Sequence, residues 1–244
     1  MKTDDSHIYV RSAAIMTTAD LLAAGRSQEQ IRTLVKRGEL LRLGIGIYAT
    51  SELAESVSRL PFGELLLSAA AAVRALGPAA VVSHRTAAQI HGLDLLGRPS
   101  SLVSVTRPPG VGSRSGRPGV LLHSAELPAE HIGARMAVPV TTVGRTVVDL
   151  ARMSPFREGV VVADSALNQK LTSKKELGGV LTGCRRWRGV RKAAEVVEFA
   201  DGLSESPLES IARVVFRDCG LPPPELQVEI GADEFIGRVD FLWE

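Results

Sequence analysis

Two short helices with matching start and stop signals lie near the N-terminus, and they constrain the fold more than any other feature. Thr17 or Thr18 can cap a helix over Ala19–Ala24, which a glycine ends. Ser27 then begins a second helix, with Gln30 three residues later in the capping-box position. Because only a few residues separate the two helices, we predict a tight helix-turn-helix.

The second helix has one apolar side and one polar side. Ile31, Leu34 and Val35 fall at helical spacing and are expected to face inward. Gly38 stops the helix, and "LLRLGIGIYAT" then predicts two short strands around a Gly-x-Gly turn. Helix, turn, helix and β-hairpin is the order of a winged helix-turn-helix, whose second helix enters the DNA major groove while the hairpin contacts backbone.

The charge of the whole chain does not identify a partner, because its formal net charge is only +2. Between residues 11 and 42, however, six basic residues (Arg11, Arg26, Arg32, Lys36, Arg37, Arg42) face three acids (Asp20, Glu29, Glu39). This local surplus favours phosphate contacts, although a solvated basic helix face is the simpler alternative. We predict a DNA-binding surface formed by Arg26, Gln28, Arg32, Thr33, Lys36, Arg37 and Arg42.

The composition, 45% hydrophobic and 23% charged, is that of a folded globular protein. Cys184 and Cys219 lie far apart without a metal-ligand pattern, which is typical of reduced thiols in the cytosol. The N-terminus has no apolar export signal, and the most apolar stretch, residues 65–73, is too short for a membrane span. We therefore expect a cytoplasmic protein with no membrane partner.

The middle of the chain, residues 60–201, carries alternating helix and strand signals and predicts a mixed α/β domain. Helices are expected from Pro61 to Gly77, in "HRTAAQIHG", and in four segments from "VGRTVVDLAR" onward, with strands in "SLVSVT", "GVLLHS" and "VPVTT". The loop over residues 107–119 contains three arginines and no acid, and is either a second phosphate-contacting arm or a plain solvated loop. The histidines have no metal-ligand spacing.

The C-terminal part begins with a strong helix signal, because Ser206 can cap a helix that has proline at its first position and Glu209 at its third. One apolar stripe follows along this helix, made of Leu208, Ile211, Ala212, Val215, Phe216 and Cys219. The segments "ELQVEI" and "FIGRVDFLW" then predict a β-hairpin. Asp240 lies inside the second strand, on the same face as Arg238, with which it could pair. The whole chain is thus expected to be α+β and mostly helical.

The N-terminal part resembles the winged-helix domain of AbiEi-type antitoxins of type IV toxin–antitoxin systems, in "TTADLLAAGRSQEQIRTLVKRGELLRLGIGIYAT". The middle part resembles the rest of that family, in "SHRTAAQIHGL" and "VPVTTVGRTVVDLAR". The resemblance implies a winged helix in residues 1–55 and an antitoxin domain in residues 60–201. It also implies a cofactor-free repressor that binds an inverted repeat in its own promoter and counteracts a nucleotidyltransferase-type toxin. Members of the family carry a basic residue at the wing tip, where this chain has Gly44–Ile47. Arg42 would then have to supply the phosphate-contacting cation of the wing.

Residues 202–244 are similar to a small endonuclease-like domain related to very-short-patch-repair nucleases and the PD-(D/E)xK fold, in "SESPLES", "GLPPPELQ" and "GRVDFLW". In that fold a helix acid, a hairpin Asp and an E-x-K strand hold a divalent metal that activates water. The resemblance implies that Glu209 is the helix acid and Asp240 the hairpin Asp and metal ligand. The E-x-K strand would come after Glu244, so we expect a truncated restriction-endonuclease-like helix and hairpin without activity. A Mg²⁺-dependent DNA endonuclease is the alternative.

Overall fold

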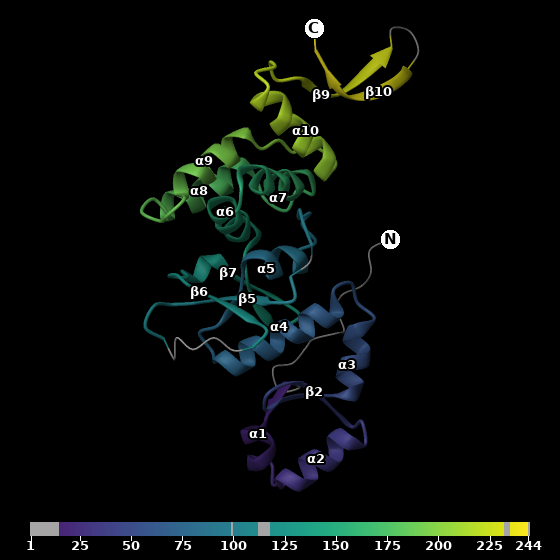
Figure 1. The fold of residues 1–244 in the computed structure, drawn as a ribbon, viewed down its shortest axis with the longest axis vertical. Coiled ribbons are helices and arrows are strands. Elements are labelled where there is room, and N and C mark those ends of the chain that lie inside the picture. Colours follow the sequence, from purple (N-terminus) through teal and green to yellow (C-terminus); the bar gives the residue numbers. More distant parts are fainter. Residues whose placement is uncertain (1–14, 99, 112–117, 232–234, 244) are drawn as a thin grey trace. The chain divides into compact units, whose positions relative to one another are not determined.

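The structure, a computed structural model, describes residues 15–98, 100–111, 118–231 and 235–243. Within these ranges the chain is an α+β protein in which helices predominate and the strands form three separate sheets. It divides into two compact units (Figure 1): unit 1 comprises Met1–Ile90 and Ser100–Thr142, and unit 2 comprises His91–Pro99 and Val143–Glu244. The three predicted domain ranges follow other boundaries and remain a prediction.

The N-terminal part of unit 1 confirms the predicted winged helix-turn-helix. Its elements are β1 (Ile15–Thr17), α1 (Thr18–Ala23), α2 (Gln28–Lys36), β2 (Leu40–Gly44) and β3 (Ile47–Thr50). The strands form an antiparallel sheet in the order β1-β3-β2. Strand β1 and the helix α3 (Ser51–Ser58), whose first turn is capped by Thr50, add to the predicted elements.

A small apolar core holds the two helices of this motif against the hairpin. Ile31 of α2 is buried together with Leu21 of α1 and Leu40 of β2, and Leu34 and Val35 pack against them half-buried. The inward face predicted for α2 is therefore confirmed. Burying this face fixes the opposite side of α2 toward solvent, since a helix of this length has only one apolar stripe.

The rest of unit 1 is one long helix, one short helix and a mixed five-stranded sheet, with strand order β6-β5-β4-β8-β7. The pairs β4–β8 and β5–β6 are parallel and the other two pairs are antiparallel. The predicted helices and strands appear here, whereas β4 and β7 were not predicted. The arginines at 114 and 117 in the predicted arm lie outside the described residues. The elements are α4 (Gly63–Leu76), β4 (Val81–Val82), α5 (His84–Ile90), β5 (Val103–Arg107), β6 (Val120–Ser124), β7 (Ile132–Arg135) and β8 (Val138–Thr141).

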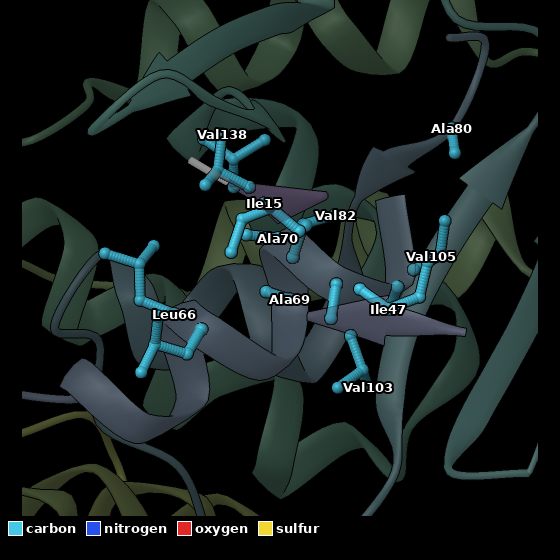
Figure 2. Packing of buried hydrophobic residues seen from close by; sticks show 14 of the residues in the cluster. Ile15, Ile47, Leu66, Ala69, Ala70, Ala80, Val82, Val103, Val105 and Val138 are labelled. Atoms are coloured by element: carbon cyan, nitrogen blue, oxygen red, sulfur yellow. The ribbon is translucent and has the colours of Figure 1, made fainter. Parts of the chain in front are cut away.

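One hydrophobic core joins the small N-terminal sheet to the rest of unit 1. Figure 2 shows Ile15 and Ile47, from the small sheet, beside Ala69 and Ala70 of α4. The same cluster includes Val105 and its neighbours in the five-stranded sheet. The alanines of α4 are small, so the helix lies close to both sheets, and the winged helix is packed on the unit rather than carried on a linker.

Unit 2 is a group of packed helices followed by a hairpin. Its elements are α6 (Val143–Met153), α7 (Phe156–Asn168), α8 (Lys174–Gly183), α9 (Val190–Phe199), α10 (Pro207–Asp218), β9 (Glu225–Gly231) and β10 (Phe235–Leu242). All five helices and both strands were predicted. Helices α6 to α9 contact one another, and α10 packs on α7. In the described part of the chain, no helix combines the length and apolarity that crossing a membrane requires.

The buried side of α10 differs from the predicted apolar stripe. Ser210 and Val214 are its buried residues, whereas Leu208 is 75% exposed. The reason is that α10 meets α7 through Arg213, whose guanidinium binds the buried carboxylate of Asp164 at 2.8 Å. This ion pair sets the rotation of the helix. Ile211, Ala212 and Phe216 of the predicted stripe are half-buried, and the ring of Phe216 packs edge-on against Phe241 and Trp243 of the hairpin.

Candidate nucleic-acid interface

Capping interactions position both helices of the motif. The Ser27 hydroxyl accepts a hydrogen bond from the Gln30 backbone N–H at 3.1 Å, and the Gln30 side chain accepts one from the Ser27 N–H at 2.8 Å. Thr17 and Asp20 form the same reciprocal pair at the start of α1. Gly25, between the helices, has a positive φ of 81°, which side-chain-bearing residues rarely adopt. The turn angle of the motif is therefore fixed by local chemistry.

The outward side of α2 presents polar and basic side chains to solvent. The flanking residues Arg26 and Arg42 are exposed. All five residues predicted on this side of α2 are exposed as well: Gln28, Arg32, Thr33, Lys36 and Arg37. Arg37 lies 3.9 Å from Glu39, at the limit of an ion pair between two exposed groups. Among the residues that the structure describes, Arg32 and Lys36 form no ion pair. Two cations one turn apart therefore remain available to an anionic partner.

The wing turn is tied to the first helix. Gly46 has a φ of 70°, and its carbonyl accepts a hydrogen bond from the Thr18 N–H at 2.9 Å. A Cβ at Gly46 would lie 3.1 Å from the Thr18 hydroxyl, so any larger residue would strain the turn. Arg42 is exposed and donates from Nε to the Gly44 carbonyl at 3.2 Å. The tip itself is apolar, since Ile45 is 72% exposed.

A cleft of about 460 Å³ lies between α2 and the wing. Gln28 and Arg32 line it from α2, and Arg42 lines it from β2. Tyr48 of β3 and Ile45 of the turn complete the opposite wall. The structure thus brings three of the predicted residues around one hollow. Tyr48 and Ile45 were not predicted, although their place in the "GIGIY" hairpin was a usable signal.

Asp20, an acid of the same motif, is engaged internally. Its carboxylate accepts hydrogen bonds from the Thr17 backbone N–H and from the Arg74 guanidinium of α4, both at 2.7 Å. The bond from the Thr17 N–H is the main cause that lowers the pKa of Asp20, and Arg74 adds to it. Asp20 is therefore ionised at neutral pH, and Arg74 rather than Arg32 or Lys36 balances its charge.

The second predicted site lies in unit 2, where the structure brings Glu209 and Asp240 to one amide. Gln227 donates from Nε2 to Glu209 at 2.9 Å and to Asp240 at 3.3 Å. Glu209 also accepts from the Ser206 hydroxyl at 2.6 Å, as a capping residue does. Arg238 pairs with Glu205 at 2.7 Å, so its predicted pairing with Asp240 is wrong. No group of three or more His, Cys, Asp or Glu side chains suited to a metal ion occurs within the described ranges.

Comparisons with known proteins agree with the N-terminal motif. Residues 11–51 match a family model described as "Transcriptional regulator, AbiEi antitoxin". The chain is 32% identical over 222 residues to the uncharacterized proteins Rv2248 and MT2308 of two Mycobacterium tuberculosis strains, an alignment that covers 89% of this chain and 74% of each relative.

The crystal structure of RV2827C protein from Mycobacterium tuberculosis has a similar fold. Its TM-score to this chain is 0.50 at 18% sequence identity, over 82% of this chain and 75% of that one. At this identity the likeness concerns the fold alone. The 32% identity over most of both chains means that this chain belongs to the protein family of Rv2248, and the match over residues 11–51 means that its N-terminal region is that of an AbiEi antitoxin-type transcriptional regulator.

Proposed function

We propose that this protein is the DNA-binding antitoxin of a type IV toxin–antitoxin system and represses its own operon inside the cell. The observation that carries the proposal is the outward side of α2, where Arg32 and Lys36 are exposed and form no ion pair within the described structure. These residues lie in the segment that matches the AbiEi regulator model. No cofactor is needed for this function.

In the proposed complex α2 lies in the major groove of double-stranded DNA. Arg32 and Lys36 bind phosphate or guanine edges, and Gln28 and Thr33 are placed to contact bases or backbone. Arg26, before the helix, and Arg37, at its end, reach the flanking phosphates. Arg42 supplies the cation of the wing, because the wing tip is the apolar Ile45. We therefore expect the wing to make one phosphate contact, through Arg42, and none through its tip.

The test is salt-dependent binding to the promoter fragment upstream of the protein's own gene. We expect Arg32→Ala with Lys36→Ala to weaken binding strongly and to make the slope of log K against log salt shallower by about 2, because each lost phosphate contact contributes about 0.9. Arg59→Ala with Arg135→Ala removes two exposed arginines of unit 1 outside the motif and is the matched control. Equal binding by the two double variants would refute the proposed interface.

The antitoxin part of the proposal concerns residues 60–201 and a nucleotidyltransferase-type toxin encoded beside this gene. It is supported by the family description of the N-terminal region and by the sequence resemblance of the middle region. Co-expression of the chain with such a neighbouring gene product tests it. Rescue of growth is expected from the wild type and also from the Arg32→Ala, Lys36→Ala variant, since neutralisation does not use α2. Loss of rescue in both would remove the antitoxin assignment and leave DNA binding intact.

One observation favours a second candidate function, that of a DNA endonuclease. Gln227 holds Glu209 and Asp240 at one position, as two acids of a nuclease site would be held. The residues present do not complete a Mg²⁺ site, because Mg²⁺ takes six oxygen ligands and the described chain places no third acid beside these two. We therefore derive no hydrolytic step. Plasmid nicking in Mg²⁺ that is equal in wild type and Asp240→Ala, or absent in both, excludes this function.

A further inference from the structure

A second basic surface lies far from the winged helix in sequence, from the end of α8 into the first turn of α9 in unit 2. Residues 184–192 read CRRWRGVRK, with five basic residues and no acid. All four arginines of this segment are exposed: Arg185, Arg186, Arg188 and Arg191. None of them has an ion-pair partner among the residues that the structure describes. Glu195, one turn further along α9, is exposed and forms no ion pair with them either. We call residues 184–192 the arginine loop.

An internal scaffold fixes this loop through its tryptophan. Trp187 is half-buried, and its ring lies 4.3 Å from the guanidinium carbon of Arg145 and 5.0 Å from that of Arg152. Both arginines belong to α6 and bind the carboxylate of Asp149, at 2.8 and 2.9 Å. Cation–π contacts of this kind strengthen when the groups are desolvated, as they are here. The loop is therefore anchored to the centre of unit 2.

The backbone of the loop is held as well. Arg152 donates from Nη1 to the Arg188 carbonyl at 3.3 Å, and the Trp187 N–H donates to the Cys184 carbonyl at 2.8 Å. Gly189 has a φ of 80°, and a Cβ there would lie 2.2 Å from the Arg152 carbonyl oxygen, so no other residue fits. Exposed arginines on a fixed backbone lose less conformational freedom on binding than arginines on a mobile loop.

The composition of this surface selects the class of partner. A protein partner is normally met by an apolar core within the interface, with charged residues at the rim. Here the one aromatic side chain, Trp187, turns inward, and no large hydrophobic residue of the described loop is exposed. Recognition must then depend on charge and on the planar hydrogen-bonding fork of arginine, which suits phosphate. A chain of phosphates matches several arginines spaced along one loop.

We propose that the arginine loop binds the phosphate backbone of double-stranded DNA and gives unit 2 a nucleic-acid contact separate from the winged helix. The proposed contact is to phosphate alone and therefore carries no base specificity. It adds affinity and salt dependence to any DNA complex of the chain. The proposal does not require α2 to be the recognition helix.

The test uses the full chain and a short DNA duplex of unrelated sequence. The loop variant carries Arg185→Gln, Arg186→Gln and Arg188→Gln, which leave Trp187 and its scaffold intact. The control carries Arg157→Gln, Lys174→Gln and Lys175→Gln, which remove the same charge from other exposed positions of unit 2. We expect the loop variant to bind at least roughly tenfold more weakly and its salt slope to be shallower by about 2 to 3, while the control changes little.

The outcomes separate this proposal from that of the winged helix. Placed on the Arg32→Ala, Lys36→Ala background, the loop substitutions should weaken binding by a further similar factor. If only the loop substitutions weaken DNA binding, the proposed role of α2 is refuted and that of the arginine loop stands. If only the α2 substitutions weaken it, the proposed role of the arginine loop is refuted and that of α2 stands. If the triple variant fails to fold, Arg185→Gln and Arg186→Gln as single changes should each remove about 0.9 from the salt slope. Equal slopes in loop variant and control overturn the proposal.

Discussion

Helices α2 and α6 each carry a pair of basic residues, one turn apart on α2 and two turns apart on α6, and the two helices use them in opposite ways. On α2, Arg32 and Lys36 lie in solvent without an ion pair in the described structure. On α6, Arg145 is completely buried and shares the carboxylate of Asp149 with Arg152. A buried guanidinium needs a partner because desolvation costs several kcal/mol per ion. Basic residues with internal acids therefore build the scaffold, and those without remain for an external anion.

The second buried ion pair of unit 2 follows the same rule. Asp164 lies between α7 and α10, where it accepts from Arg213 at 2.8 Å and from the Asp201 N–H at 2.7 Å. Burial raises the pKa of Asp164, and Arg213 opposes the rise. Arg213 also donates to the Phe199 carbonyl at 2.7 Å. The Arg213 guanidinium is thus engaged by groups inside unit 2, and we assign it to the scaffold rather than to a binding surface.

The largest expected effect comes from breaking the buried group on α6. Asp149→Ala leaves Arg145 buried without its carboxylate, which should lower the free energy of unfolding of unit 2 by about 3–5 kcal/mol. Arg32→Ala, an exposed change, should stay within about 0.5 kcal/mol. Urea unfolding followed by the fluorescence of Trp187, in a Trp243→Phe background, measures the effect of Asp149→Ala in unit 2, and unfolding followed by far-UV circular dichroism measures that of Arg32→Ala in unit 1. A loss below about 1 kcal/mol for Asp149→Ala would contradict the scaffold role, since removing one partner of a buried ion pair costs more.

A smaller effect is expected at the cap of α2. Ser27→Ala removes the acceptor of the Gln30 N–H and should destabilise unit 1 by about 1 kcal/mol. Ser58→Ala, at the end of α3, removes only a hydroxyl that donates to the Glu55 carbonyl and is the matched control. Thermal unfolding monitored by circular dichroism compares the two. The same cap positions the outward side of α2, so DNA affinity should fall along with stability in Ser27→Ala and not in the control.

Capped helices were predictable from the sequence because their signals are local. The Ser27–Gln30 and Ser206–Glu209 pairs lie three residues apart and form the expected hydrogen bonds. Strands β1 and β4 were not predictable, because three and two residues show no periodicity. They exist only through pairing with residues distant in sequence, as Ile15 pairs with Ala49. Helix α3 had an overlooked signal in Thr50, whose hydroxyl accepts from the Leu53 N–H.

The candidate site likewise has one part that the local sequence predicts and another that depends on contacts between distant residues. Helical spacing predicted which residues of α2 face solvent, because one apolar stripe determines the other side. The cleft with Tyr48 could not be predicted, since it depends on how the hairpin folds back on α2. The arginine loop was missed for a related reason. Its basic residues look like a solvated run until Trp187 is seen against Arg145 and Arg152, which are far away in sequence.

The smallest expected effect concerns the pH dependence of two carboxylates, one from each unit. The folded-state pKa of Asp20 is lowered, so its contribution is complete above the unfolded value of about 4 and is lost as pH falls through the folded pKa. Asp20→Asn should therefore cost about 1 kcal/mol or less at neutral pH, because Asp20 and Arg74 are both about 40% exposed, and this cost should vanish in acid.

Asp164 should show the opposite sign. Its folded-state pKa is raised, so the wild type gains stability relative to Asp164→Asn as pH falls through that pKa. The test is the unfolding free energy of wild type and of both variants across a pH series. As pH falls, the stability advantage of wild type over Asp20→Asn should shrink, while the stability of wild type relative to Asp164→Asn should rise. Parallel trends would mean that Asp164 is held ionised by Arg213 as firmly as Asp20 is held by Thr17. The contrast between an exposed, hydrogen-bonded acid and a buried, paired acid would then fail for these two carboxylates.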